Sequence, residues 1–158
     1  MAIPVTTIGL KIAVAAEATA GTRPTSGYKH LPMVTSFPEL DLSPDTLDTT
    51  SYDNLKYKSS TPGLIDTTGA QAMEAIYNED LKTIWDTIAT AYNEDIASNK
   101  GVWLSVALPG DTKAWFIPIE PIELGVPNFP LADVVKINVQ FTIAGDIVYD
   151  SVPTYDEE

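Results

Sequence analysis

Residues 78–101 constrain the fold more than any other stretch, because they alone have the spacing of a long amphipathic helix. Asn78 can cap the first amides of such a helix, and Gly101 suits the left-handed residue that ends many helices. One helix cannot form a bundle, so this helix must pack on β-strands. Its apolar stripe comprises Leu81, Ile84, Trp85, Ile88, Ala91, Tyr92 and Ile96.

The strand with the most regular alternation is predicted at residues 134–143. One face of this strand should lie in the core and the other in water or in a polar channel. The core face would carry Val135, Ile137, Val139, Phe141 and Ile143, and the polar face Lys136, Asn138, Gln140 and Thr142. Shorter strands are expected at residues 8–15, 33–42, 70–77, 102–108 and 113–119, with a brief extension at 147–149.

Proline and glycine separate the predicted strands. Residues 109–112 (Pro-Gly-Asp-Thr) predict a hairpin turn, and Pro118 and Pro121 predict that the strand at 113–119 lies at a sheet edge or ends there. Loops are expected at residues 17–32 and 120–133, and an acidic, loose tail at 150–158. The pattern predicts one domain, residues 1–158, that is mostly β with one α-helix.

Residues 43–69 differ from the rest because they are rich in Ser, Thr, Asp and Asn. A structureless loop of this length is uncommon in a compact domain, so the segment is either functional or a hairpin with arms at residues 46–52 and 55–59. We interpret it as an arm that contacts another subunit, with a mobile surface loop as the alternative. The contact residues would be Thr46, Leu47, Tyr52, Asp53, Asn54, Leu55 and Tyr57, with Asp53 and Asn54 at the tip.

The charge of the chain argues against nucleic-acid binding. There are 22 acidic and nine basic residues, a net charge of −13, whereas affinity for nucleic acid comes mainly from basic groups. The acidic surface serves either solubility or the repulsion of a polyanion, and composition alone does not decide between them. No apolar run is long enough to span a membrane, and the absence of cysteine removes disulfides and thiolate chemistry.

No motif predicts a catalytic, cofactor or metal site. His30 is the only histidine, so a zinc site lacks its other ligands, and neither a P-loop nor a nucleophile elbow occurs. Asp41, Asp45 and Asp48 lack the glycine and the closing glutamate of a calcium loop. We therefore expect a protein that is not an enzyme and that needs no cofactor.

The tryptophans leave a second function open. Trp85 belongs to the helix stripe, whereas Trp103 and Trp115 lie on the two arms of one predicted hairpin. If they share a face, they make a large cross-strand contact, or a platform that stacks on sugar rings. A monomeric carbohydrate-binding β-sandwich is therefore the alternative function.

Several segments, taken together in their order and spacing, resemble the segments of a known protein family. They are residues 8–17 (IGLKIAVAAE), 19–24 (TAGTRP), 27–28 (GY), 32–38 (PMVTSFP), 46–50 (TLDTT) and 57–64 (YKSSTPGL), followed by the helix and by the hairpin at Pro109 and Gly110. From about residue 8 to residue 143 the chain thus resembles the major tail tube proteins of long-tailed, siphovirus-like bacteriophages and related prophages.

This resemblance implies a β-sandwich or barrel-like core with a flanking helix and a long protruding hairpin or loop. It implies self-assembly into hexameric rings that stack into a hollow tail tube, with residues 43–69 reaching the neighbouring ring. DNA would pass through the tube during ejection, and the tape-measure protein would fill it beforehand. Further implied partners are the tail terminator and the baseplate or distal tail proteins, in a virion tail assembled in the host cytoplasm without membrane insertion.

In such a tube the polar face of residues 134–143 is the candidate channel lining. Lys136, Asn138, Gln140 and Thr142 would face the lumen. Lys136 does not suit this position, because a cation there would attract DNA. We expect it to pair with an acidic neighbour such as Glu39 or Asp41.

Overall fold

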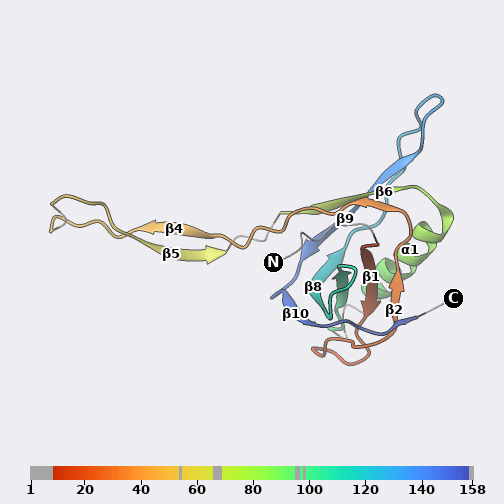
Figure 1. The fold of residues 1–158 in the computed structure, drawn as a ribbon, viewed down its shortest axis with the longest axis horizontal. Helices are drawn as coiled ribbons and strands as arrows, with labels where there is room; N and C mark the ends of the chain where they lie inside the picture. Colours follow the sequence, from red (N-terminus) through yellow and green to blue (C-terminus); the bar gives the residue numbers. More distant parts are fainter. Residues whose placement is uncertain (1–8, 54, 66–68, 95–96, 98, 157–158) are drawn as a thin grey trace. The chain divides into compact units, whose positions relative to one another are not determined.

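The computed structural model describes residues 9–53, 55–65, 69–94, 97 and 99–156. The chain divides into two compact units: Met1–Pro38 with Ala70–Glu158, here called the sheet unit, and Glu39–Gly69, here called the hairpin unit. The elements, labelled in Figure 1 where space allows, are β1 Lys11–Ala16, β2 Tyr28–His30, β3 Val34–Ser36, β4 Pro44–Asp48, β5 Ser60–Ile65, β6 Gln71–Ile76, α1 Glu79–Glu94, β7 Val102–Ala107, β8 Lys113–Pro121, β9 Lys136–Ile143, β10 Val148–Ser151 and β11 Tyr155–Asp156.

The predicted helix is present as α1, and it begins as the sequence indicates. The Asn78 side-chain oxygen accepts a hydrogen bond from the Leu81 amide at 2.8 Å, as an N-cap residue does. The helix is shorter than predicted, because it ends at Glu94. Ile96 lies outside the described residues. The left-handed conformation predicted for Gly101 belongs instead to Asn99, whose φ is 60°.

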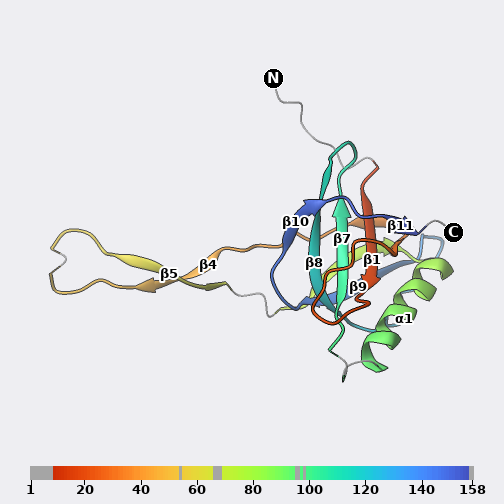
Figure 2. The ribbon, with the colours of Figure 1, turned by 90° about the horizontal axis from the view of Figure 1, so that it is seen from below.

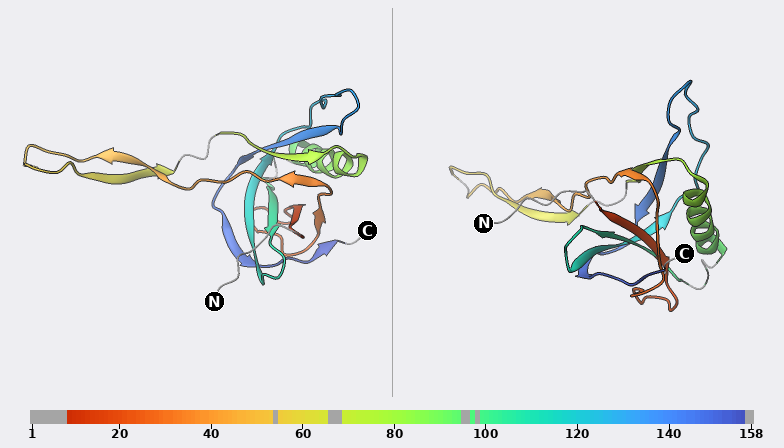
Figure 3. Two further views of the ribbon diagram at one scale, coloured as in Figure 1. Left: turned by 45° about the horizontal axis from the view of Figure 1, so that its top comes forward. Right: turned by 45° about the vertical axis from the view of Figure 1, so that its right-hand side comes forward.

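Nine strands of the described residues form one sheet, in the order β11-β2-β1-β7-β8-β9-β6-β3, with β10 beside β8. A flat sheet would separate β2 from β3 by about 29 Å, which is six strand spacings. Only residues 31–33 join these two strands, and four residue steps span at most about 14 Å. The sheet must therefore curl, and Figure 3 shows the half-barrel that results. The predicted barrel-like, mostly β fold is confirmed.

Strand β8 is central in this sheet, so the first predicted alternative, an edge position, is wrong, whereas the second is confirmed because the strand ends at Pro121. One side of β8 pairs with β7, while the other side pairs first with β10, through residues 113–116, and then with β9, through residues 119–121. Pro118 lies between the part of β8 that pairs with β10 and the part that pairs with β9. Neither β10 nor β9 pairs with position 118, so the missing amide hydrogen of proline costs no hydrogen bond on this side. A proline is thus accommodated inside a sheet at the point where the neighbouring strand changes.

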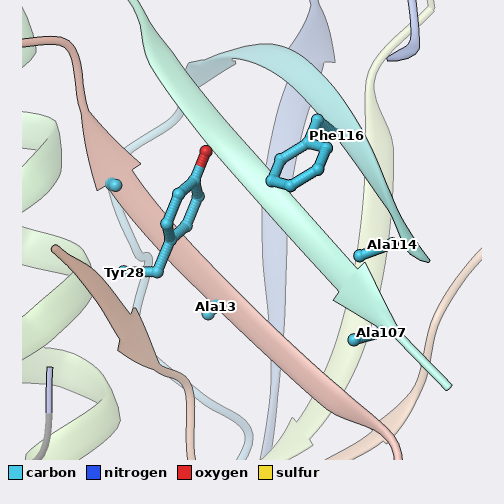
Figure 4. Close-up of a cluster of buried hydrophobic side chains, with 6 residues drawn as sticks. Ala13, Tyr28, Ala107, Ala114 and Phe116 are labelled. Carbon is cyan, nitrogen blue, oxygen red and sulfur yellow. The ribbon is translucent and has the colours of Figure 1, made fainter. Parts of the chain in front are cut away.

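Both faces of the curled sheet bury apolar side chains. On one face Tyr28 and Phe116, whose ring centroids are 5.8 Å apart, pack over small residues (Figure 4). Those small residues are Ala13, Ala15, Ala107 and Ala114. The other face carries larger residues, including Val14, Leu104, Ile117, Ile119, Val139 and Phe141.

Helix α1 covers the face of larger residues. It packs on β1 and β8, as Figure 2 shows for β1, and it buries Leu81, Trp85, Ile88 and Ala89. None of these four residues belongs to the cluster around Tyr28. The Trp85 ring nitrogen donates to the Ile122 carbonyl at 2.8 Å, so the tryptophan is buried without losing its hydrogen bond.

The C-terminal segment contains two strands, although the sequence predicts a loose tail from Asp150. Strand β10 pairs with β8, and β11 pairs in parallel with β2. The Asp150 carboxylate accepts a hydrogen bond from the Arg23 guanidinium at 2.8 Å. Strand β2 itself lies within the predicted loop 17–32, since Tyr28 fills the core there.

The hairpin unit is a two-stranded antiparallel ribbon of β4 and β5 (Figure 1). Asp48 pairs with Ser60, and beyond this pair the Thr49 amide donates to the Ser59 carbonyl at 3.0 Å. The predicted hairpin is therefore present, but its strands differ from the predicted arms. The second strand, Ser60–Ile65, follows the predicted arm at 55–59.

Candidate assembly surfaces

The polar face of β9 is as the alternation predicts. Ile137, Val139 and Phe141 are buried, whereas Lys136, Asn138 and Gln140 are exposed and Thr142 is partly exposed. All four predicted lumen residues therefore lie on one face of one strand. Whether this face lines a channel stays a prediction.

Lys136 has an acidic partner, but the partner differs from those predicted. Its ammonium group lies 3.6 Å from the Glu74 carboxylate on β6, whereas Glu39 and Asp41 belong to the hairpin unit. The register between β6 and β9 pairs Glu74 with Asn138, so Glu74 is diagonal to Lys136 on the same face. The charge of the lysine is thus offset locally by a cross-strand neighbour.

The polar face of β9 borders a hollow of about 520 Å³. Lys136, Asn138 and Gln140 line it together with Glu74 and Glu123. At the end of the face, the Thr142 hydroxyl hydrogen-bonds to the Glu120 carboxylate at 3.3 Å. Three carboxylates therefore accompany one ammonium group along this surface, which is suited to repelling a polyanion.

Tyr92 of α1 lies beside the Glu120 carboxylate. Burial raises the pKa of Tyr92, and the negative charge of Glu120 raises it further. The tyrosine is therefore neutral at physiological pH and adds no charge to this surface.

The predicted arm residues lie in the hairpin unit with their side chains exposed. Thr46 and Leu47 belong to β4, Tyr52 and Asp53 form a turn, and Leu55 and Tyr57 precede β5. Asn54 lies outside the described residues. Seven large apolar or aromatic side chains of this unit are exposed: Leu42, Leu47, Tyr52, Leu55, Tyr57, Leu64 and Ile65. An isolated two-stranded ribbon is marginally stable in water, so such side chains favour contact with another surface.

Sequence reasoning missed a second exposed apolar segment, which is the connection between β8 and β9. Val126, Phe129, Leu131 and Val134 are exposed there. The signal was available for Val126, Phe129 and Leu131, because they occur among prolines without helical or strand periodicity, whereas Val134 is part of the strand predicted at 134–143. Such residues have no regular element through which to reach the core.

Trp103 and Trp115 do not share a face. Trp103 pairs with Pro118, whereas Trp115 pairs with Val106, three positions away along β7. Trp103 packs against the Tyr28 cluster and donates its ring N–H to Glu17 at 2.8 Å, while the Trp115 ring contacts the Tyr149 ring in a tilted arrangement, with centroids 4.9 Å apart. The predicted contact and the aromatic platform for sugar rings are therefore not formed.

Other candidate residues have local structural roles. The Asp41 carboxylate accepts from the Ser43 amide, and the Asp48 carboxylate accepts from the Thr50 amide. The side-chain hydroxyls of Ser43 and Thr50 lower the pKa of the Asp41 and Asp48 carboxyl groups most, and these amide hydrogen bonds lower it further. Among the described residues, no group of three or more His, Asp or Glu side chains is arranged to hold a metal ion. In the same part of the chain, no helix has the length and apolar character needed to cross a membrane.

The architecture defines a class of fold: a sheet curled into a half-barrel, with one helix on its outer layer. The same fold occurs in a chain of a solved assembly, described as the cryo-EM structure of the anti-feeding prophage (AFP) baseplate, 6-fold symmetrised. The superposition covers 96% of this chain and 99% of that chain, with a TM-score of 0.61 and 8% sequence identity. No protein-family model matches the sequence, and no curated protein matches it.

Proposed function

We propose that this chain is a structural, non-enzymatic protein of a phage tail or a related prophage particle. In this proposal copies assemble into hexameric rings, and the rings stack into the hollow tail tube through which DNA is ejected. The observation that carries the proposal is the likeness of fold to a chain of the six-fold symmetrised baseplate, which extends over almost the full length of both chains.

The charge distribution supports a channel-lining role for β9. The surface around Lys136, Asn138, Gln140 and Thr142 carries Glu74, Glu120 and Glu123. In a ring, six copies of such a surface would repel phosphate groups rather than bind them. Glu74 also limits the attraction that Lys136 alone would exert on DNA.

The exposed side chains of the hairpin unit support a role between subunits. We propose that Leu47, Tyr52, Leu55 and Tyr57 contact a neighbouring ring. Head-to-tail contacts of this kind grow without limit when the symmetry does not close them, as a stack of rings requires.

A tail tube role implies specific binding partners and a location for this chain. The tape-measure protein would occupy the lumen before ejection, and the tail terminator and the baseplate or distal tail proteins would bind the two ends. The protein would be assembled in the host cytoplasm and reside in the virion tail.

A second candidate function is a single ring within a baseplate, because the similar chain belongs to a baseplate structure. Negative-stain electron microscopy of the concentrated protein separates the two functions. Long tubes are the expected result. Isolated rings or short stacks would favour the baseplate role, and a stable monomer at every concentration would contradict both.

A further inference from the structure

Residues 152–156, here called the strap, cross the face of the sheet that carries the Tyr28 cluster. The strap continues from β10, which pairs with β8, and ends in β11, which pairs with β2. Strands β7 and β1 lie between β8 and β2 in the sheet, so the strap passes over both of them, as Figure 2 shows. All of these elements belong to the sheet unit. The strap therefore covers part of the face that α1 leaves uncovered.

The face beneath the strap is complementary to it in shape. Small side chains lie there, among them Ala13 and, directly opposite it in the register, Ser105. Tyr155 of the strap packs against the Tyr28 cluster, and the Lys11 ammonium group lies 5.1 Å from the centroid of the Tyr155 ring. Pro153 is buried as well. Small residues on the sheet thus leave room for large residues on the strap.

The far end of the strap is held by few polar interactions. Strand β11 pairs with β2 through two residues, whereas β10 pairs with β8 through four. Burial raises the pKa of Tyr155, and the Ser105 hydroxyl beside it lowers it. Neither hydroxyl makes a hydrogen bond of good geometry among the described residues, although both are buried. A buried hydroxyl without a partner costs about 1–3 kcal/mol, so the release of β11 returns part of what it loses.

The near end of the strap, at β10, is held more firmly. The Asp150 carboxylate accepts a hydrogen bond from Arg23 at 2.8 Å, and the Arg23 guanidinium lies 4.4 Å from the centroid of the Phe116 ring. The junction between the two ends is residues 152–154, which contain Pro153. Proline restricts its own φ and keeps the preceding residue extended. An extended junction is suited to carrying β11 onto another chain while β10 stays in place.

A second copy of this chain is the partner whose fit to the face is already visible. The strap contacts residues that every copy carries, so the strap of a neighbouring chain would make the same contacts as the chain's own. Exchange of straps therefore sacrifices no contact at the face. Its equilibrium depends on the junction and on the other contacts that bring copies together.

We propose that copies exchange straps when they assemble, so that β11 of one copy pairs with β2 of the next. Tyr155 of the donor then covers the Tyr28 cluster of the acceptor, while β10 of the donor remains on its own β8. Each copy donates one strap and accepts one, so a closed ring leaves no face uncovered. This inference rests on the proposed function, since it assigns one link between neighbouring copies of the proposed ring.

Cysteine cross-linking tests the exchange directly, because the natural chain contains no cysteine. The double variant Lys29→Cys with Asp156→Cys places one cysteine on each strand of the β2–β11 pair, at positions that lie opposite each other. The matched control, Lys113→Cys with Ser151→Cys, does the same for β8 and β10, before the junction. A short bis-maleimide is added to each full-length variant, first as dilute, unassembled protein and then at the concentration where wild-type protein assembles. In dilute protein both pairs should link within one chain, which shows that each variant folds.

In assembled protein the 29–156 pair should link chains to one another, at several times the yield of the 113–151 pair, on a denaturing gel. Tubes in which the 29–156 pair links only within single chains would overturn the exchange alone. Equal linking between chains by both pairs would also overturn it, because random collision would explain both. Preferential 29–156 linking between chains in rings that never become tubes, or in dimers, would support exchange and contradict the tube. Monomers with links only within single chains at every concentration would overturn both.

Discussion

The sheet unit and the hairpin unit place the same residue types in opposite environments. Leu31, Leu81 and Leu104 of the sheet unit are at most 1% exposed, whereas Leu55 and Leu64 of the hairpin unit are 93% and 87% exposed. Burial of a leucine stabilises a fold by about 1.5–3 kcal/mol, and an exposed leucine contributes little of this. The sheet unit therefore has its own source of stability, and the hairpin unit depends on contacts outside its ribbon.

The largest expected effect is on assembly. Deleting residues 48–60 removes Tyr52, Leu55 and Tyr57, three of the seven exposed apolar or aromatic side chains of the hairpin unit, and none of the core. We expect a folded protein with a nearly unchanged thermal midpoint that forms no tubes in electron micrographs. The double variant Tyr52→Ser with Leu55→Ser is the matched milder change, and it should weaken assembly without shortening the chain. Tubes of normal length from the deletion would remove the hairpin unit from the assembly mechanism.

The next largest effect is on the free energy of unfolding, and it compares a leucine-to-alanine substitution in each unit. Leu104→Ala should lower the free energy of unfolding by about 2–5 kcal/mol, because it leaves a cavity in the core. Leu64→Ala should change it by less than about 0.5 kcal/mol, since that side chain is already exposed. Urea denaturation of dilute, unassembled protein measures both values. Equal losses would mean that the hairpin unit packs on a core of its own.

A smaller effect on the free energy of unfolding is expected when one of two similar hydrogen bonds is removed, one from each unit. The Asn78 side chain accepts from the Leu81 amide at 2.8 Å in the sheet unit, and the Asp48 side chain accepts from the Thr50 amide at 2.9 Å in the hairpin unit. Asn78→Ala should lower the free energy of unfolding by about 1 kcal/mol, as loss of a helix cap does. Asp48→Ala should leave it unchanged, because the ribbon can open without unfolding the sheet. A global loss from Asp48→Ala would contradict the independence of the two units.

The smallest effect depends on pH. The hydrogen bond from Arg23 holds the pKa of Asp150 below its usual range, so this contribution to stability is complete above about pH 5 and is lost as the pH falls through the lowered value. Asp150→Asn should therefore lower the thermal midpoint slightly at pH 7, and by less as the pH falls through the lowered pKa. Asp41→Asn is the control, because the lowered pKa of Asp41 arises within the hairpin unit. A midpoint difference for Asp150→Asn that does not decrease as the pH falls below about 4 would contradict this origin.

Patterns within a few residues, such as alternating apolar residues and a helix cap, predicted the elements in which those patterns are most regular. The alternation of β9 and the cap at Asn78 both depend on neighbours within a few residues, and both are confirmed. Strand β5 escaped prediction because it contains Pro62 and Gly63, which normally interrupt strands. Gly63 is explained by long-range packing, since an added Cβ would lie 3.2 Å from the side chain of Leu47.

The register between strands could not be predicted from the sequence. The pairing of Lys136 with Glu74 and the separation of Trp103 from Trp115 both follow from which residues lie opposite each other. A shift of one position would reverse either outcome, and no local signal fixes it. The polar face of β9 was therefore predictable, and the exposed connection at 122–135 had a sequence signal that was missed, whereas the partners of β9 required the folded structure.

The position of β8 has a consequence for the order of events at the ribosome. Its second side is completed only by β9 and β10, which are translated after it. The nascent chain therefore cannot close its interior until residue 151 has emerged, long after residues 39–69 have left the exit tunnel. During that interval the exposed apolar side chains of residues 39–69 are present on chains whose sheet is incomplete, which favours contacts between neighbouring nascent chains.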